Sequence, residues 1–262
     1  MAVSAGASGG SLSGKMKLGA QWPEGVGRRI LASVDSTLDE AARIGPGLSG
    51  PEWILARVQT KGRGRRGRVW LEPAGNFAAT LVMFPEGDPA RMALRSFVAA
   101  LSVLDGCTAV AGRSDGFALK WPNDVLLNGG KLAGILLESA DGMLSIGIGV
   151  NLVAAPPAGK IEARALRPVS LLSETGVSVD PEEFLTFVAA AFARYEAQFN
   201  MLGFEPIRTA WLSHAARLGQ VITARAGNTE TTGTFETVDA TGNLVLMSGK
   251  TRVAIPAADV FF

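Results

Sequence analysis

The sequence predicts an α+β protein that ends in a small all-β domain. Short apolar runs rich in β-branched residues lie between Gly and Asn turns, which is typical of strands. Two longer segments carry apolar residues at helical spacing. From about residue 217 onward only short strand-like segments remain. A chain of 262 residues with 47% hydrophobic residues is large enough to bury a sizeable core.

The first part of the chain alternates predicted strands and helices. Strands are expected at residues 53–59, 77–84, 117–120, 125–127, 131–138 and 143–150. The turn Asn128-Gly129-Gly130 predicts a hairpin between two of them. Helices are expected over residues 91–111, from Pro181 with Asp180 as N-cap, and over about 205–217.

The end of the chain predicts a small β-barrel. Its strands are expected at residues 221–225, 231–238, 243–247 and 251–255. We therefore expect a disordered Gly/Ser-rich leader over 1–20, a large domain over 21–216 and a small β domain over 217–262. No unbroken apolar run reaches the ~18 residues of a membrane span, so we expect no membrane segment and a cytoplasmic location.

The composition excludes several kinds of chemistry. The chain has one cysteine, Cys107, and one histidine, His214, so it can form neither an internal disulfide framework nor a Cys/His zinc site. A Ser–His triad could use only His214, which sits in a helix-like stretch where a structural role is favoured. The reaction should therefore depend on Lys, Arg, Asp, Asn and backbone amides. The net charge of +1 argues against the whole protein binding polyanions.

The strongest motif is the Gly/Arg-rich segment from Gln59 to Trp70. Six of the 25 basic residues fall between Arg57 and Arg68, with no acidic residue among them. Glycines let the backbone approach a ligand, arginines can surround phosphate oxygens, and Trp70 could stack on a purine. We expect this loop to be mobile until an anion binds. The alternatives are a solvated surface loop and an Arg/Gly nucleic-acid patch.

Two further motifs place polar residues beside strands. In Lys120-Trp-Pro-Asn-Asp124, Lys120 could meet a phosphate or carboxylate, and Asn123 and Asp124 offer oxygen ligands for Mg²⁺; the alternative is a capped turn. Lys131 opens an apolar strand in which Gly134 allows close approach, so an anionic ligand could lie there. The alternative is an edge lysine before a core strand.

Two weaker motifs complete the set. Ser36-Thr37-Leu-Asp39-Glu40 is a capping pattern at a helix start, which could also hold polar groups against a small ligand. The segment Gly147-Ile-Gly149-Val-Asn151 is a strand with glycines that either pack or admit a ligand.

In this order the five motifs resemble the biotin protein ligase family, also called biotin–[acetyl-CoA-carboxylase] ligases, over roughly residues 30–155. The resemblance implies a class II synthetase-like catalytic domain, with a mixed, mostly antiparallel sheet and flanking helices, followed by a small SH3-like β-barrel. The chain departs from the family pattern at two places. Leu38 stands where members of the family often carry Asn after Ser-Thr, and Leu71-Glu72 stands where many carry Ser before the Pro. Some relatives carry an N-terminal DNA-binding domain. We find none before Ile30 and expect a ligase-only protein without DNA binding.

The resemblance also implies the reaction and its partners. With ATP and Mg²⁺, biotin would be activated as biotinyl-5′-AMP and then transferred to a lysine of a biotin carboxyl carrier protein or domain. A homodimer is possible. The alternatives are a lipoate–protein ligase or lipoyl/octanoyl transferase of related fold, an Arg/Gly nucleic-acid-binding module, and an inactive biotin-binding regulator.

The family's functional residues carry over motif by motif. The resemblance implies biotin contacts from Ser36, Thr37, Gln59, Gly62, Arg63 and Gly134; ATP or adenylate contacts from Arg63, Arg65, Arg66, Arg68, Trp70, Lys120, Asn123 and Asn151; catalysis by Lys131 and Arg65; and a Mg²⁺ ligand in Asp124.

Overall fold

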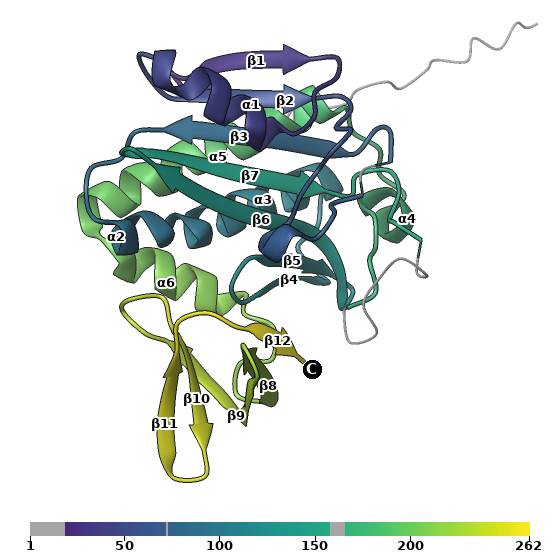
Figure 1. Ribbon diagram of the computed structural model, residues 1–262. Helices are drawn as coiled ribbons and strands as arrows, with labels where there is room; N and C mark the ends of the chain where they lie inside the picture. The colour runs from purple at the N-terminus through teal and green to yellow at the C-terminus, as the bar shows by residue number, and fades with distance from the viewer. Residues whose placement is uncertain (1–18, 72, 158–165) are drawn as a thin grey trace, which may run out of the picture.

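The computed structural model describes residues 19–71, 73–157 and 166–262 (Figure 1). Its main sheet has seven strands in the order β1-β2-β3-β7-β6-β5-β4. Only β1 and β2 run parallel, so the predicted mixed, mostly antiparallel sheet is confirmed. The strands are β1 Gly27–Leu31, β2 Glu52–Ala56, β3 Phe77–Met83, β4 Phe117–Lys120, β5 Asp124–Leu127, β6 Gly130–Ala140 and β7 Met143–Val150.

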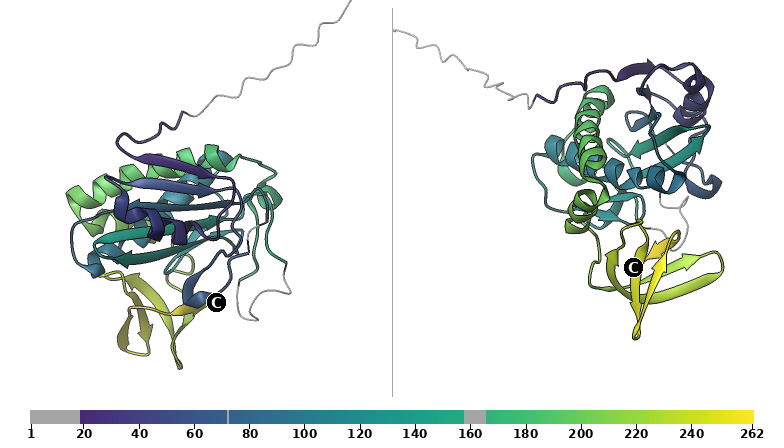
Figure 2. Two further views of the ribbon diagram at one scale, coloured as in Figure 1. Left: turned by 45° about the horizontal axis from the view of Figure 1, so that its top comes forward. Right: turned by 90° about the vertical axis from the view of Figure 1, so that its left-hand side faces the viewer.

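Helices cover the two faces of this sheet unequally. On one face α3 and α5 pack against each other and against the strands, whereas the other face carries α1 over β2, β3 and β7 (Figures 1 and 2). Part of that second face therefore stays open to a ligand. The helices are α1 Thr37–Ile44, α2 Pro89–Ala93, α3 Arg95–Ala111, α4 Leu171–Thr175, α5 Pro181–Leu202 and α6 Phe204–Ser213, with 3-10 turns η1 Gly45–Gly47 and η2 Arg65–Gly67.

Local signals set several of these boundaries as predicted. Asp180 caps α5 by accepting a hydrogen bond from the Glu182 amide, and Pro181 takes the first helical position. The hairpin between β5 and β6 turns through Asn128 and Gly129, both with positive φ. Cys107 is fully buried in α3, where burial raises the pKa of its thiol, so it is a core residue.

The segment Pro89–Ala111, which contains α2 and α3, is long and apolar enough to cross a membrane by length and composition alone. Arg91, Arg95 and Asp105 interrupt this segment, so it contains no unbroken apolar run of about 18 residues. Because 61% of its most apolar window is buried inside the protein, we assign it to the core.

The end of the chain forms a second, antiparallel sheet in the order β11-β10-β9-β8-β12. Four of its strands match the predicted positions closely, but the three-residue β12 was not predicted, nor were β1 and α4. The helix predicted over 205–217 ends at Ser213, with an exposed His214 as its C-cap. The strands are β8 Val221–Ala226, β9 Thr229–Val238, β10 Leu244–Ser248, β11 Thr251–Ile255 and β12 Asp259–Phe261.

The two sheets share one continuous hydrophobic core. Phe235 and Val260 of the second sheet belong to the same buried cluster as Trp211 of α6 and Phe97 of α3. The small sheet thus lies against the α6 end of the main sheet (Figure 2). The leader predicted over residues 1–20 lies, up to residue 18, outside the described residues.

Candidate active site

A cavity of about 640 Å³ opens on the face of the main sheet that carries α1. The start of α1, the Gly/Arg-rich loop, the turn between β4 and β5, strands β6 and β7, and residues 258–261 all contribute to its walls. Most of the predicted site residues therefore meet in one place. Those that line the cavity are Ser36, Thr37, Gln59, Arg63, Arg65, Arg68, Trp70, Lys120, Asn123, Asp124, Lys131, Gly134 and Asn151.

Three glycines form the floor of the cavity. Gly134 of β6 pairs with Gly149 of β7, and the indole of Trp70 lies on both: a Cβ added to Gly149 would be 2.5 Å from Trp70 Cε2. Farther along β7, the side chain of Leu38 lies over Gly147, where an added Cβ would be 2.8 Å from Leu38 Cδ1. Only glycine leaves room for these close contacts with the sheet.

At the α1 end of this floor, buried polar groups form a short hydrogen-bonded chain. The Thr37 amide and Oγ1 both donate to Gln59 Oε1, at 2.8 and 3.1 Å, and Thr80 Oγ1 donates to Thr37 Oγ1 at 2.8 Å. Ser36 caps α1 by accepting from the Leu38 amide. These hydrogen bonds fix the direction of each donor and acceptor before a ligand binds. Thr80 was missed, since a threonine in an apolar strand carries no sequence signal of this role.

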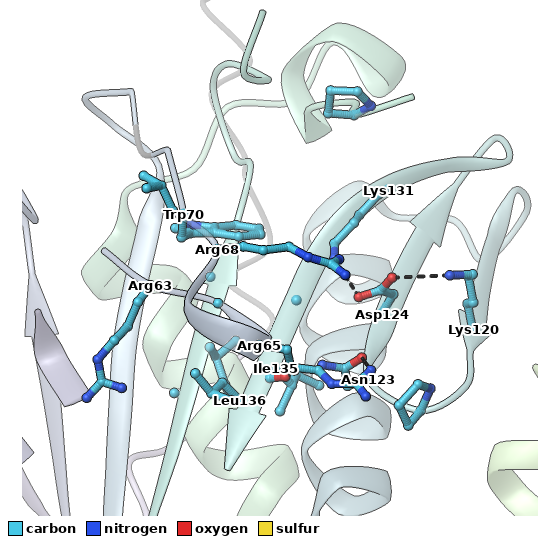
Figure 3. A pocket seen from close by; sticks show the side chains of 18 of the residues that line it. Arg63, Arg65, Arg68, Trp70, Lys120, Asn123, Asp124, Lys131, Ile135 and Leu136 are labelled. Carbon is cyan, nitrogen blue, oxygen red and sulfur yellow. Dashed lines mark hydrogen bonds and ion pairs between the residues drawn. The ribbon is translucent and has the colours of Figure 1, made fainter. Parts of the chain in front are cut away.

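Beyond Trp70, two lysines flank a buried carboxylate (Figure 3). Asp124 lies 2.7 Å from Lys131 Nζ and 3.6 Å from Lys120 Nζ. Burial would raise the pKa of Asp124, but the two lysines outweigh it and keep that pKa below its usual value. Burial also lowers the pKa of Lys120. Two positive charges share one negative charge here, which leaves a net attraction for an anion.

Asn123 connects this cluster to the sheet and to the loop. The side-chain Nδ2 of Asn123 donates to the Ile135 carbonyl at 2.5 Å, and the backbone carbonyl of Asn123 accepts from the Ile135 amide at 3.0 Å. Its Oδ1 accepts a longer hydrogen bond, 3.4 Å, from Arg65 (Figure 3). Arg65 also donates to the carbonyl of Ala258, the residue before β12, and burial lowers the pKa of Arg65.

The Gly/Arg-rich loop is a narrow hairpin with a 3-10 turn at its tip. The Trp70 amide donates to the Gly62 carbonyl at 2.9 Å and the Gly64 amide to the Arg68 carbonyl at 2.7 Å. Gly67 takes a φ of +71° at the tip. Gly62 lies against the backbone of Trp70 and is not among the residues that line the cavity, and its predicted contact with biotin remains a prediction.

Carboxylates from outside the loop hold its arginines. Arg63 pairs with Asp39 of α1 at 2.7 Å and with Glu138 of β6, and it points away from Lys131 and Asp124 (Figure 3). These partners were not predicted, because both acids lie far from the loop in the sequence.

Asp259 of β12 holds the other side of the loop. It pairs with Arg66 at 2.5 Å and with Arg68 at 3.1 Å, and β12 lies beside η2 (Figure 2). Arg66 pairs with Asp259 and is not among the residues that line the cavity, and its predicted contact with the nucleotide remains a prediction. Asp259 itself was missed because it lies in the unpredicted strand β12.

The residues present do not fit a Mg²⁺ ion held by the protein itself. No group of three or more His, Cys, Asp or Glu side chains gathers within residues 19–71, 73–157 and 166–262. Asp124, the predicted ligand, is already neutralised by Lys131 and Lys120. A cation here would depend on ligands that arrive with a substrate.

Asn151 lines the cavity, but its side-chain amide braces the surrounding structure. Its Nδ2 donates to the Val169 carbonyl at 3.0 Å, and its Oδ1 accepts from Asn76 at 3.4 Å. Asn76 in turn accepts hydrogen bonds from the amides of Val153 and Ala154. The predicted nucleotide contact of Asn151 remains a prediction.

Comparison with known proteins connects these features to a family. A model described as the biotin/lipoate A/B protein ligase family matches residues 30–151, and one described as the biotin protein ligase C terminal domain matches residues 218–262. The chain is 55% identical to a biotin–[acetyl-CoA-carboxylase] ligase of Paracoccus denitrificans, covering 89% of this chain and 99% of that protein. It is 31% identical to the bifunctional ligase/repressor BirA of Bacillus subtilis, covering 88% of this chain and 71% of that protein.

The fold agrees with these matches. A biotin protein ligase from Aquifex aeolicus, solved in complex with biotin and ATP, superimposes with a TM-score of 0.78 at 25% identity, covering 89% of this chain and 97% of that chain. Sequence, fold and cavity therefore lead to the same conclusion: the chain belongs to the biotin protein ligase family.

Proposed function

We propose that the chain is an ATP-dependent ligase that converts biotin to biotinyl-5′-AMP and transfers biotin to a lysine of an acceptor protein. The observation that carries the proposal is the order of groups along one cavity. Polar groups at the start of α1 come first, then a glycine floor under Trp70, then the lysine pair around Asp124. This order suits a ligand with a polar ring, an apolar tail and an anionic end.

The polar end would bind the ureido ring. Thr37 and Gln59 are already joined by hydrogen bonds, and Ser36 is fixed as a cap, so their geometry costs little to organise. Leu38 makes this end more apolar than the Asn of many relatives would. Ring recognition would therefore rest on Ser36, Thr37 and Gln59.

In the first step, a biotin carboxylate oxygen attacks the α-phosphorus of ATP, and pyrophosphate leaves. Negative charge grows on the phosphoryl oxygens, so positioned cations supply most of the stabilisation. Lys131 would contact both the carboxylate and the phosphate, while Asp124 holds its Nζ in place. Arg65 and Lys120 would pair with the phosphates, and Arg68 lies at the same wall of the cavity.

In the second step, the neutral ε-amine of an acceptor lysine attacks the carbonyl carbon of the mixed anhydride, AMP leaves with the bonding electrons, and the amine nitrogen gives up one proton to solvent. No enzyme nucleophile is needed, which agrees with a buried Cys107 and with a His214 outside the cavity. The protein would contribute orientation, charge and exclusion of water. Mg²⁺, when it enters with ATP, would neutralise phosphate charge.

We further propose that the acceptor is a biotin carboxyl carrier protein or domain and that the protein acts in the cytoplasm. A homodimer and the absence of DNA binding remain predictions. A salt-resistant, sequence-dependent gel shift with an operator-like duplex would contradict the latter.

The test is exchange of labelled pyrophosphate into ATP, measured with biotin and, in parallel, with lipoate. The proposal predicts exchange that requires biotin. Exchange supported equally by lipoate, or none with biotin, would contradict it.

A further inference from the structure

Trp121 connects the candidate active site to the second sheet. Its side chain is 3% exposed and lines the cavity within the turn between β4 and β5. Its indole Nε1 donates a hydrogen bond of 3.0 Å to the carbonyl of Gly242, in the turn between β9 and β10. Most buried indole N–H groups are hydrogen-bonded, and the second sheet supplies the partner of this one.

The turn that accepts this hydrogen bond is tightly organised by Asp239. The Asp239 carboxylate accepts from the amides of Thr241 and Asn243, both at 2.9 Å, and from their side chains at 2.8 and 2.9 Å. Burial would raise the pKa of Asp239, but these hydrogen bonds keep it below its usual value. Gly242 has a φ of +84° and lies against Leu94 and Phe97, so its carbonyl has a fixed direction.

The residues on both sides of Trp121 carry the proposed chemistry. Lys120 precedes it and pairs with Asp124, which in turn pairs with Lys131. The turn residues Lys120 and Asp124 are also β-sheet partners, so a rotation of the turn moves both charges.

We propose that Trp121 is a positioning residue and that the β9–β10 turn, through Gly242, sets the orientation of Lys120 and Asp124 for adenylate formation. The small second sheet would thus support the reaction without contributing a reacting group at this point. The inference rests on the proposed function, because its kinetic part is measured on biotin-dependent pyrophosphate exchange.

Two variants test the contact from its two sides. Trp121→Phe keeps the ring and removes the N–H, while Asp239→Ala loosens the accepting turn without touching the cavity. A matched control is Trp22→Phe, which removes a similar indole hydrogen bond, 2.7 Å to the Val26 carbonyl, outside the cavity. A second control is Trp211→Phe, whose Nε1 has no hydrogen-bond partner to lose among the residues that the structure describes.

We expect Trp121→Phe and Asp239→Ala each to lower kcat for exchange about tenfold. The KM for biotin should stay within about twofold of the wild-type value. The polar end of the cavity is formed by Ser36, Thr37 and Gln59, which the Trp121 contact does not hold. The double variant should lose no more than either single variant, because both changes break one contact. The Trp22 and Trp211 variants should keep wild-type kcat.

Hydrogen exchange provides a readout that does not depend on activity. Amides of residues 120–124 should exchange faster in both test variants and not in the controls. If Trp121→Phe does not fold, Asp239→Ala alone decides. The inference would be overturned if amide hydrogen exchange at residues 120–124 were the same in the test variants as in the wild type. It would also be overturned if the losses of kcat multiplied in the double variant. A wild-type protein without biotin-dependent exchange would instead contradict the proposed function, while the amide measurement would still test the contact.

Discussion

The Gly/Arg-rich loop and the floor of the cavity are held in opposite ways. The loop is fixed by ion pairs to Asp39, Glu138 and Asp259, and the side chains of the paired arginines, Arg63, Arg66 and Arg68, are 29–44% exposed. The floor is fixed by contact: the glycines of β6 and β7 lie directly under Trp70 and Leu38. Each exposed ion pair contributes little stability, and added salt weakens it. Salt does not weaken close packing in the same way. The conformation of the loop should therefore depend on charge changes and on salt concentration. The floor should depend on changes in side-chain volume.

The largest effect should come from the lysine between these two regions. Lys131→Ala removes the cation nearest the proposed reacting groups, so we expect adenylate formation to fall at least ~10³-fold, about 4 kcal/mol. Pyrophosphate release measures it, and circular dichroism checks the fold. The control is Lys61→Ala in the loop, since Lys61 is exposed and does not line the cavity. Near wild-type release from the Lys131 variant would contradict the role.

The floor should be sensitive to one methyl group. Gly149→Ala would place a Cβ 2.5 Å from the Trp70 ring, so the indole must shift into the ligand's space. We expect the KM for biotin to rise at least ~10-fold, equally at low and high salt. Gly47→Ala is the control, because an added Cβ there meets nothing within 4 Å among the described residues and Gly47 does not line the cavity. Equal effects of the two changes would contradict the role of the floor.

Arg65 should affect retention of the adenylate more than folding. Within the described part of the chain its guanidinium makes long hydrogen bonds to Asn123 and Ala258, so a phosphate can become its principal partner. Arg65→Gly should speed adenylate dissociation about tenfold, as measured by rapid filtration. Raised salt should narrow the difference from wild type. An unchanged dissociation rate would argue against this placement.

The lowered pKa of Lys120 predicts a pH limit. Burial lowers this pKa, so the charge of Lys120 is present below the lowered value and is lost as the pH rises through it. Exchange activity should therefore fall on the alkaline side. Lys120→Arg should move that fall to higher pH, since arginine does not titrate there. A pH profile of kcat that is identical in both proteins would assign the alkaline fall to another group.

The smallest effect concerns the anchoring acids. We expect the loop to order further when biotin and ATP bind, so trypsin should cleave it more slowly in their presence. Asp259→Asn and Glu138→Gln should each speed cleavage of the ligand-free protein roughly two- to fivefold. The first loses the ion pairs with Arg66 and Arg68, and the second loses the ion pair with Arg63. The control is Glu236→Gln, which breaks the Arg252 pair away from the cavity. Equal cleavage rates with and without ligands would contradict the ordering.

The sequence predicted what depends on local chemistry. The hairpin through Asn128 and Gly129 and the Asp180 cap of α5 follow from turn and capping preferences. The motif residues could be named from the resemblance. Their partners could not be named. Thr80 donates a hydrogen bond to Thr37 from 43 positions away in the sequence, and Asp259 holds Arg66 from 193 positions away. Such contacts depend on how the strands pair, which no local pattern determines.

The glycines show the same limit. Gly134 and Gly149 are recognisable as unusual strand residues, but that both lie under Trp70 follows from the register of β6 and β7. The strand β1 was missed because its five residues include two exposed arginines and one glycine, which is a weak strand signal.

The complete reaction tests the central claim most directly. The full chain is incubated with ATP, Mg²⁺, biotin and a biotin carboxyl carrier domain, and the mass of the acceptor is measured, with a lipoyl domain and lipoate in parallel. The account predicts one biotinyl group on one lysine of the carrier domain, formed only with ATP, and no modified lipoyl domain. An unmodified carrier domain, or a lipoylated lipoyl domain, would contradict it.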